Sequence, residues 1–341
     1  MITQAYQLVK KGDATTAFQM NSVQLPSLQS HEVLIKVEAF GLNYADVMAR
    51  NGLYREAPPM PCVLGYEVVG EVIEVGASEQ QSLIGKRVVG FTRFGGYAQH
   101  AITTIDAISE IGDMPTNNAL ALATQGVTAY YMANYISPLR IGEKVLIHAA
   151  AGGVGTLLIQ LAKLSGAVVV AKVSSAEKEA KCKELGADFT VNYKKEDYVE
   201  FINRHIELFR LDASFNPIGG STFKKDKQVL GFGSRLFLFG GSQLSEGKMG
   251  ILSQLNFLRK MGVLIPAFQM MQSKSIIGVN MLKIADNKPE VLKHCLNAVV
   301  ELYKLGKIKT ENGGDYQHTA LSEAHDLLES GKSIGKIAIY W

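Results

Sequence analysis

The sequence predicts an α/β protein in which a doubly wound parallel sheet is combined with a separate antiparallel β domain. Between about residues 124 and 241, short apolar runs alternate with helical stretches, which is typical of βαβ units around a parallel sheet. Residues 1–120 show strand-like alternation between glycines instead. The 341 residues also exceed the ~250 to 300 at which a single core usually divides, so we expect two domains.

The elements of each domain can be read from apolar periodicity. Alternation at Val33, Ile35 and Val37 predicts a strand of the first domain, as do the runs Val68–Val75 and Arg87–Phe91. The parallel strands are expected at Lys144–His148, Ala167–Val173, Asp212–Phe215 and Arg235–Phe239, with helices at Val154–Leu164 and Glu177–Leu185.

The last part of the chain is expected to return to the first domain. We place the boundaries at 1–124 with 272–341 for the antiparallel domain, and at 125–271 for the parallel domain. A helical, Met-rich insert is expected near 242–271. Strands at Ile276–Val279 and Lys336–Tyr340 would enclose a helix at Pro289–Leu305.

Composition excludes several classes of function. Thirty-five Lys and Arg against 32 Asp and Glu give a net charge of +3, too balanced for a nucleic-acid-binding protein. No apolar stretch approaches the ~20 residues that cross a bilayer, so we expect no transmembrane segment. The N-terminus lacks the pattern of a secretion signal, which favours the cytoplasm. The three cysteines are isolated, which argues against a cysteine-built zinc site.

A glycine-rich turn after the first parallel strand is the most informative motif. It reads Ala149-x-x-Gly152-x-x-Gly155 and precedes a helix, so its glycines allow a sharp turn and close packing of helix and strand. The helix N-terminus then offers backbone N–H groups to a diphosphate. A dinucleotide is the expected ligand, with Ala151, Gly152, Gly153, Val154 and Gly155 as its contacts.

The second parallel strand indicates which dinucleotide binds. It ends at Ala171–Ser175 without the acidic residue that usually binds the ribose hydroxyls of NAD. Ser174 can donate a hydrogen bond to a 2′-phosphate, and Lys178, one helical turn further on, can neutralise its charge. These residues favour NADP(H), although Lys178 could also be an ordinary surface lysine.

At these residues the chain resembles the medium-chain dehydrogenases/reductases, in particular the zinc-independent quinone oxidoreductase group that includes zeta-crystallin. Residues that match the group's nucleotide motif are Glu143, Leu146, Ala150, Ala151, Gly152, Gly153, Gly155, Gln160 and Lys163. Further matches are Gly41–Asp46, Gly52–Tyr54, Gly65–Gly70, Gly126–Tyr130 and Glu184–Asp188. The segments Asn43–Pro61 and Ser242–Ser275 look most like the vesicle amine transport protein branch.

The resemblance implies a GroES-like domain built from both chain ends, a Rossmann domain between them, and cofactor and substrate in the cleft. It also implies a preference for NADPH and matches Ser174, Lys178 and Tyr193 to positions that hold the adenosine phosphate. Thr128 matches a contact on the nicotinamide side. The family further suggests a homodimer, formed through an edge strand such as Arg235–Phe239.

The same resemblance locates the three segments that supply zinc ligands in metal-dependent relatives. These segments carry Asn43, Tyr66 and Gln125, which cannot form a tight zinc site, so we expect no metal. Hydride transfer without a Lewis acid favours a quinone or an α,β-unsaturated carbonyl, whose charge delocalises into an enolate. Asn43 and Tyr54 are the candidates to hold the carbonyl oxygen, unless Asn43 only forms a turn and Tyr54 only packs. His148 and Glu67 are expected to be structural.

Two other functions remain open. A reductase of 2-enoyl thioesters would use the same hydride addition, and the sequence shows nothing that selects a coenzyme A or carrier-protein arm. Alternatively, the chain is a nucleotide-binding protein with vestigial catalysis, whose insert contacts lipid or protein through residues such as Met270 and Met271. Burial of that insert in a pocket wall or subunit contact is the simpler expectation.

Overall fold

The computed structural model describes all residues except 207–209 and 247–249, and the chain divides into two compact units. The first unit comprises residues 1–128 and 281–341, and the second comprises residues 129–280. The first unit thus contains both chain ends, as expected. Its C-terminal part begins at Met281 rather than at residue 272, because the strand at Ser275–Gly278 joins the parallel sheet of the second unit.

The first unit is built on antiparallel sheets, which the resemblance implied. A smaller sheet has the strand order β2-β1-β4, and a seven-stranded sheet has the order β15-β16-β3-β5-β6-β8, with β7 also paired to β3. Only the β15–β16 pair of this sheet is parallel. The strands are β1 (Ile2–Leu8), β2 (Phe18–Gln24), β3 (Glu32–Leu42), β4 (Cys62–Val63), β5 (Glu67–Val75), β6 (Arg87–Phe91), β7 (His100–Thr104), β8 (Ile108–Glu110), β15 (Asn312–Gln317) and β16 (Lys336–Tyr340).

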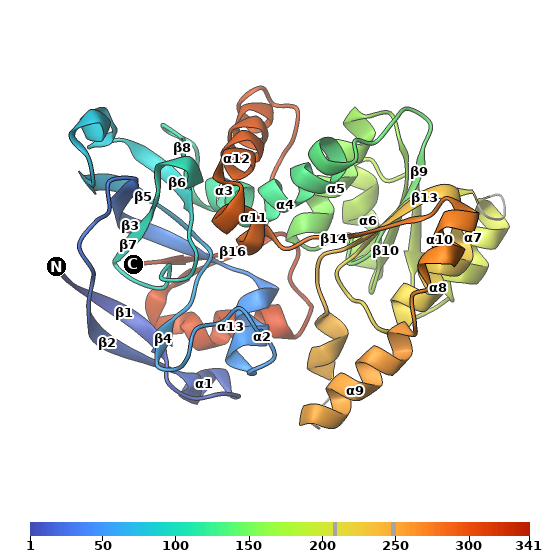
Figure 1. Cartoon of the computed structure of the whole chain (residues 1–341), viewed down its shortest axis with the longest axis horizontal. Helices are drawn as coiled ribbons and strands as arrows, with labels where there is room; N and C mark the ends of the chain where they lie inside the picture. The colour runs from blue at the N-terminus through green and yellow to red at the C-terminus, as the bar shows by residue number, and fades with distance from the viewer. Residues whose placement is uncertain (207–209, 247–249) are drawn as a thin grey trace. The chain divides into compact units, whose positions relative to one another are not determined.

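The N-terminal and C-terminal parts of the chain pair with each other in the larger sheet. The last strand, β16, pairs antiparallel with β3, so that Ile339 lies opposite Phe40, and both side chains are fully buried. Helices α2 and α13 are drawn close together beside this sheet, and α12 is the longest helix of the unit (Figure 1). The helices are α1 (Ala14–Ala17), α2 (Tyr44–Arg50), α3 (Thr116–Ala121), α4 (Val127–Tyr130), α11 (Met281–Asn287), α12 (Pro289–Lys304) and α13 (Leu321–Glu329).

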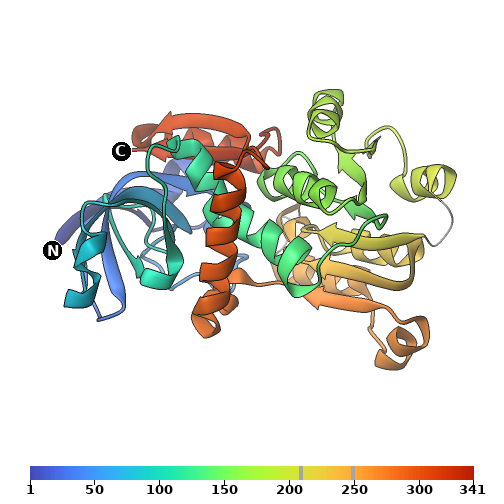
Figure 2. The same cartoon turned by 90° about the horizontal axis from the view of Figure 1, so that it is seen from above.

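The second unit contains a six-stranded parallel sheet with the order β11-β10-β9-β12-β13-β14. In order along the chain this is the 3-2-1-4-5-6 arrangement of a Rossmann fold. Figure 2 shows its strands side by side. They are β9 (Lys144–Ile147), β10 (Val168–Val173), β11 (Phe189–Asn192), β12 (Leu211–Asn216), β13 (Leu230–Leu238) and β14 (Ser275–Gly278).

The helices of this unit are α5 (Gly153–Leu164), α6 (Ala176–Glu184), α7 (Tyr198–His205), α8 (Ser221–Val229), α9 (Gly250–Met261) and α10 (Pro266–Gln272). Helices α5, α6 and α8 follow strands that the sequence predicted, whereas α7 follows β11, which was not predicted. A buried apolar cluster that includes Leu146, Val170, Ile202 and Phe223 joins sheet and helices. Burial of these side chains on both faces explains why the strands read as continuous apolar runs.

The strand that was expected to form a homodimer contact was wrongly placed at a sheet edge. The segment Arg235–Phe239 was expected to provide a sheet edge, but β13 lies between β12 and β14. Within the described part of the chain, the edges of this sheet are therefore β11 and β14. The same described residues contain no helix that is long and apolar enough to cross a membrane.

Candidate functional site

The glycine-rich turn lies between β9 and α5, as predicted; of the residues 151–155, Ala151 and Gly152 lie in the turn and 153–155 form the first turn of α5. Ala149 has a positive φ of 47°, and Gly152 is the residue that precedes the helix. A Cβ atom at Gly155 would lie 2.6 Å from the carbonyl oxygen of Ala149, so only glycine allows this approach. The N–H groups of the first helical turn have no acceptor within the helix, which suits this end of α5 to a phosphate.

Ser174 and Tyr193 lie next to each other at the carboxyl ends of β10 and β11. Val173 is paired with Asn192, and the backbone N–H of Tyr193 donates to the carbonyl of Val173 at 3.1 Å. Ser174 is half-buried, whereas the side chain of Tyr193 is 48% exposed. Because ligands of open parallel sheets bind outside the carboxyl ends of the strands, both residues are placed where a nucleotide is expected.

Lys178 lies on the first turn of α6, directly after Ser174. The side chain of Ser175 caps this helix and accepts a hydrogen bond from the backbone N–H of Lys178 at 3.3 Å. Partial burial lowers the pKa of the Lys178 ammonium. The neighbouring Glu177 is exposed, and Glu179 accepts a hydrogen bond from Thr190 on β11. The structure therefore brings the three residues Ser174, Lys178 and Tyr193 to one edge of the sheet.

His148 is buried directly below the turn, in agreement with its expected structural role. Its Nε2 atom lies 2.9 Å from the carboxylate of Asp226 on α8, and both side chains are inaccessible to solvent. Burial lowers the pKa of His148, so the imidazole is neutral near pH 7. It connects the end of β9 to α8 rather than facing a substrate.

In the first unit, Asn43 belongs to a buried charged network between β3, β5 and β16. Its Nδ2 atom donates to both carboxylate oxygens of Glu67 at 2.8 Å, and Lys336 donates to its Oδ1 atom at 3.2 Å. Lys336 also forms an ion pair with Glu67, and both side chains are fully buried. This differs from the expectation that the Asn43 amide N–H holds a substrate carbonyl, because Glu67 already accepts its hydrogen bonds. Glu67 is structural, as expected.

Tyr54 and Tyr66 lie beside this network. Their ring centroids are 6.2 Å apart and the rings meet edge to face, while Phe94 packs against Tyr66 at 5.3 Å. Burial raises the pKa of Tyr54 to about 12 and also raises that of Tyr66, so both phenols stay protonated near pH 7. Within the described residues the Tyr66 hydroxyl is buried without a hydrogen-bond partner. Buried hydroxyls without a partner usually indicate an absent water or ligand.

Gln125 and Thr128 lie where the chain leaves α3 and enters α4. The segment Leu122–Gly126 is a π-helical turn, a feature that is frequent at functional sites. Gln125 is buried, and its Oε1 atom has no hydrogen-bond partner among the described residues. The Thr128 hydroxyl donates to the carbonyl of Thr124 at 2.6 Å, which leaves its oxygen lone pairs as acceptors.

The three positions at which the resemblance places zinc ligands can now be compared. Asn43 and Tyr66 are both buried beside Glu67, and Thr124, next to Gln125, donates to the carbonyl of Tyr66 at 3.3 Å. In the part of the chain that the structure describes, no three His, Cys, Asp or Glu side chains are grouped to hold a metal ion. Instead, the Lys336 ammonium supplies the positive charge beside Glu67.

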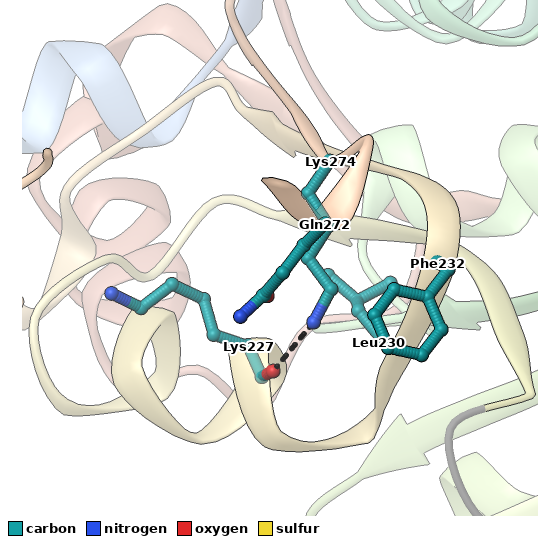
Figure 3. Close-up of a pocket in the computed structure, with 5 residues that line it drawn as sticks. All are labelled: Lys227, Leu230, Phe232, Gln272 and Lys274. Atoms are coloured by element: carbon teal, nitrogen blue, oxygen red, sulfur yellow. Dashed lines mark hydrogen bonds between the residues drawn. The ribbon is translucent and has the colours of Figure 1, made fainter. Parts of the chain in front are cut away.

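A surface hollow in the second unit contains none of the predicted residues. It measures about 200 Å³ and is lined by Lys227, Leu230, Phe232, Gln272 and Lys274. Figure 3 shows the Lys274 ammonium donating to the backbone carbonyl of Lys227, at 3.3 Å. Phe232 is 76% exposed at its rim. This hollow has no acid, nucleophile or metal-ligand set, so we do not assign the reaction to it.

Sequence reasoning missed the partners Lys336 and Asp226. Lys336 is a fully buried charge at the start of an otherwise apolar strand. This position in the strand was the one feature of the sequence that could have indicated its burial. Asp226 stood in the run Lys224–Lys227, which reads as a solvated surface, yet its side chain is fully buried. Only the tertiary structure reveals its partner His148.

Comparison with known proteins agrees with this architecture. Residues 29–134 match the family described as alcohol dehydrogenase GroES-like domain, and residues 153–297 match the family described as zinc-binding dehydrogenase. The synaptic vesicle membrane protein VAT-1 homolog of Rattus norvegicus is 30% identical over 90% of this chain and 76% of its own length. The corresponding Danio rerio protein is also 30% identical, and the chain spans 65% of its length.

Quinone oxidoreductases form the other group of relatives. A probable quinone oxidoreductase of Schizosaccharomyces pombe is 29% identical over 97% of this chain and 95% of its own length. The crystal structure of Escherichia coli quinone oxidoreductase complexed with NADPH superposes with a TM-score of 0.85, at 25% identity, and covers 99% of this chain and all of that one. The chain therefore belongs to the medium-chain dehydrogenase/reductase superfamily, in the quinone oxidoreductase-like group close to the VAT-1 proteins.

Proposed function

We propose that the protein is a reductase that uses NADPH to reduce a quinone or an α,β-unsaturated carbonyl compound. The observation that carries this proposal is the carboxyl edge of the second unit's sheet. The glycine-rich turn before α5 lies at this edge, and so do Ser174 and Lys178. The end of β10 carries no acidic residue of the kind that binds the ribose hydroxyls of NAD. The similarity to a quinone oxidoreductase complexed with NADPH supports the proposal.

The residues present fit a phosphorylated dinucleotide. The absence of a Cβ at Gly155 lets α5 pack closely against the backbone of Ala149 and Ala150, and the N-terminus of α5 favours negative charge. The hydroxyl of Ser174 can donate to a 2′-phosphate, and the ammonium of Lys178 can offset its charge. The exposed ring of Tyr193 offers a flat apolar face for the adenine. We therefore assign nucleotide binding to residues 151–155, Ser174, Lys178 and Tyr193.

We assign the polarisation of the acceptor to Tyr54. A bound reduced nicotinamide supplies the hydride, which leaves negative charge on the oxygen of a conjugated acceptor. A phenol with a pKa of about 12 remains protonated and can donate its hydrogen bond to that oxygen. The hydroxyl of Tyr66 lies beside that of Tyr54 and interacts with it.

In this proposal, Asn43 positions the Glu67 carboxylate and Thr128 contacts the nicotinamide. Asn43 holds the Glu67 carboxylate beside Tyr66, and does not itself need to contact the acceptor. The Thr128 hydroxyl has already donated its hydrogen to Thr124, so its lone pairs fit the amide N–H of a nicotinamide.

Oxidation of NADPH by 1,4-naphthoquinone, followed by absorbance in a stopped-flow instrument, tests the proposal. We expect Tyr54→Phe to lower kcat by about 10²-fold or more, as removal of one oxyanion donor does in other enzymes. The matched control Tyr316→Phe alters a tyrosine on β15 and should leave kcat unchanged. Absence of NADPH oxidation with every quinone and enone would refute the proposal, and activity on crotonyl-CoA alone would favour a thioester reductase.

A second candidate function, binding through the insert, is favoured by the exposure of α9 and α10. Met270 is 77% exposed and Met271 is 73% exposed, and Leu258 and Phe268 are also more than half exposed. None of these four side chains lines the hollow at Phe232, and a pocket wall or subunit contact was the simpler expectation from the sequence. We propose that they support a homodimer, next to the edge strand β14. Sedimentation should then show a dimer that Met270→Glu/Met271→Glu converts to a monomer, whereas a monomeric wild type that floats with liposomes would indicate lipid binding.

A further inference from the structure

The second unit contains a buried charge directly beneath the carboxyl edge of its sheet. Lys172, on β10, is only 5% exposed, and its Nζ atom lies 3.2 Å from Nδ1 of His148. An ammonium can only donate, so Nδ1 of His148 accepts and its Nε2–H donates to Asp226. The three side chains thus form the ordered series Lys172, His148, Asp226.

Asp226, the negatively charged member of this series, is held in place by further hydrogen bonds. Asp226 accepts hydrogen bonds from Tyr198 at 2.8 Å, from Ser214 at 2.8 Å and from Asn216 at 2.7 Å. Burial opposes ionisation of Asp226, but the interactions with His148 and with these donors hold its pKa below the usual value. A buried carboxylate therefore compensates the buried ammonium through a neutral imidazole.

The positive end lies against the residues proposed to bind the nucleotide. The Lys172 Nζ atom lies 4.8 Å from the ring centroid of Tyr193 and 4.7 Å from that of Tyr198, distances typical of cation–π contacts. Tyr198 is buried, whereas Tyr193 is 48% exposed. Ser174 follows two residues after Lys172, just beyond the end of β10.

We propose that Lys172 is a specificity-determining residue that favours NADPH over NADH, an inference that rests on the proposed nucleotide site. The ammonium holds the ring of Tyr193 at the edge where the adenosine end of a dinucleotide is expected. It also places a positive charge two residues before Ser174, the residue proposed to contact the ligand's 2′-phosphate. A charge within the protein interior is screened far less than a surface lysine, so it acts on the doubly charged phosphate over a longer distance.

Binding of both nucleotides to Lys172→Met tests this inference. We expect the Kd for NADPH to rise about tenfold, and the Kd for NADH to change less than threefold, because NADH lacks the 2′-phosphate. The matched control is Lys183→Met, which removes an exposed lysine of α6 and changes the net charge equally. This control should preserve both constants, which separates a local effect from a change in overall charge.

A second variant protects the experiment against misfolding. Lys172→Met leaves Asp226 without its compensating charge, whereas Lys172→Met/Asp226→Asn removes both charges together and keeps one acceptor oxygen for Tyr198 and His148. The Kd for NADH divided by the Kd for NADPH should fall in both variants. A further comparison in the Tyr193→Ala background should show a smaller effect of Lys172→Met, because part of its action passes through that ring.

The outcomes distinguish this inference from the function on which it rests. If the wild type binds NADPH but Lys172→Met and the double variant retain the wild-type ratio of the NADH Kd to the NADPH Kd within twofold, Lys172 is only structural and the inference is overturned. If the folded wild type binds neither nucleotide, the proposed function fails first. A lower ratio in both variants, with Lys183→Met unchanged, supports the assignment.

Discussion

Asp46 is the residue whose protonation is most strongly altered by the fold. It is fully buried and accepts hydrogen bonds from the backbone N–H groups of Asn43 at 2.8 Å and Gly65 at 3.3 Å. Burial, with the nearby charge of Glu67, raises its pKa from 3.8 to about 8. The folded protein therefore holds a proton on Asp46 that the unfolded chain releases above about pH 4.

This shift predicts a loss of stability as the pH rises. Because the folded state binds more protons, the contribution of Asp46 is fully present below about pH 4 and is lost up to about pH 8. The free energy of unfolding should fall by up to about 1.4 kcal/mol per pH unit in this window. Asp46→Asn, which imitates the protonated acid, should remove this part of the slope in urea unfolding between pH 5 and 8. Equal slopes in the variant and the wild type would contradict the assignment.

The ion pair of Lys336 and Glu67 leads to a second prediction at this scale. Both groups are fully buried, so Lys336→Met leaves an uncompensated carboxylate and should cost about 3–5 kcal/mol of unfolding free energy. Lys336→Met/Glu67→Gln removes both charges and should recover most of that loss. A double-mutant cycle by chemical denaturation measures the coupling, and additive losses would show that the two charges do not interact.

At the scale of the element, the approach of α5 to the glycine-rich turn depends on Gly155. A methyl group there would lie 2.6 Å from backbone atoms of Ala149 and Ala150, which cannot move away as a flexible side chain could. We expect Gly155→Ala to cost about 1–3 kcal/mol and to weaken nucleotide binding, because the N-terminus of α5 must shift. Gly278→Ala on β14, where a Cβ would meet no atom within 4 Å, is the matched control. Thermal unfolding and nucleotide titration that fail to separate the two variants would refute this account of α5.

Elements with strong local patterns were predictable from the sequence. The helix expected at Val154–Leu164 is α5, and the strand expected at Lys336–Tyr340 is β16. The strand Phe189–Asn192 was not predicted, because two of its four residues are polar and its place in the sheet is set by pairing with β10. The π-helical turns at Leu122–Gly126 and Tyr131–Ile136 also have no sequence pattern that separates them from an α-helix.

For the candidate site, the sequence indicated residue types better than their partners. Ser174 and Lys178 could be proposed from the end of the second parallel strand, whereas Tyr193 was implied only by the family resemblance, because the strand before it was not predicted. The engagement of Asn43 by Glu67 and Lys336 could not be predicted, since these residues come from strands that are distant in the sequence. A buried polar side chain reveals its role only when its hydrogen-bond partners are known.

At the scale of the whole molecule, the two units have different sheets and different proposed roles. The second unit carries the parallel sheet and the residues assigned to the nucleotide, and the first carries the phenols assigned to the acceptor. The first unit depends on its C-terminal strand, because β16 lies between β15 and β3 in the larger sheet. Sequence alone indicated two domains, but the boundary at Asn280 follows from the pairing of β14 with β13.

The central claim is that this chain binds a phosphorylated nicotinamide dinucleotide at the carboxyl edge of its parallel sheet. Calorimetric titration of the wild type with NADPH and with NADH tests it most directly, with Ser174→Ala/Lys178→Met as the variant. We predict saturable binding of one NADPH per chain, tighter than that of NADH, and a loss of this preference in the variant. A folded wild-type protein that shows no saturable heat with either nucleotide would contradict the claim.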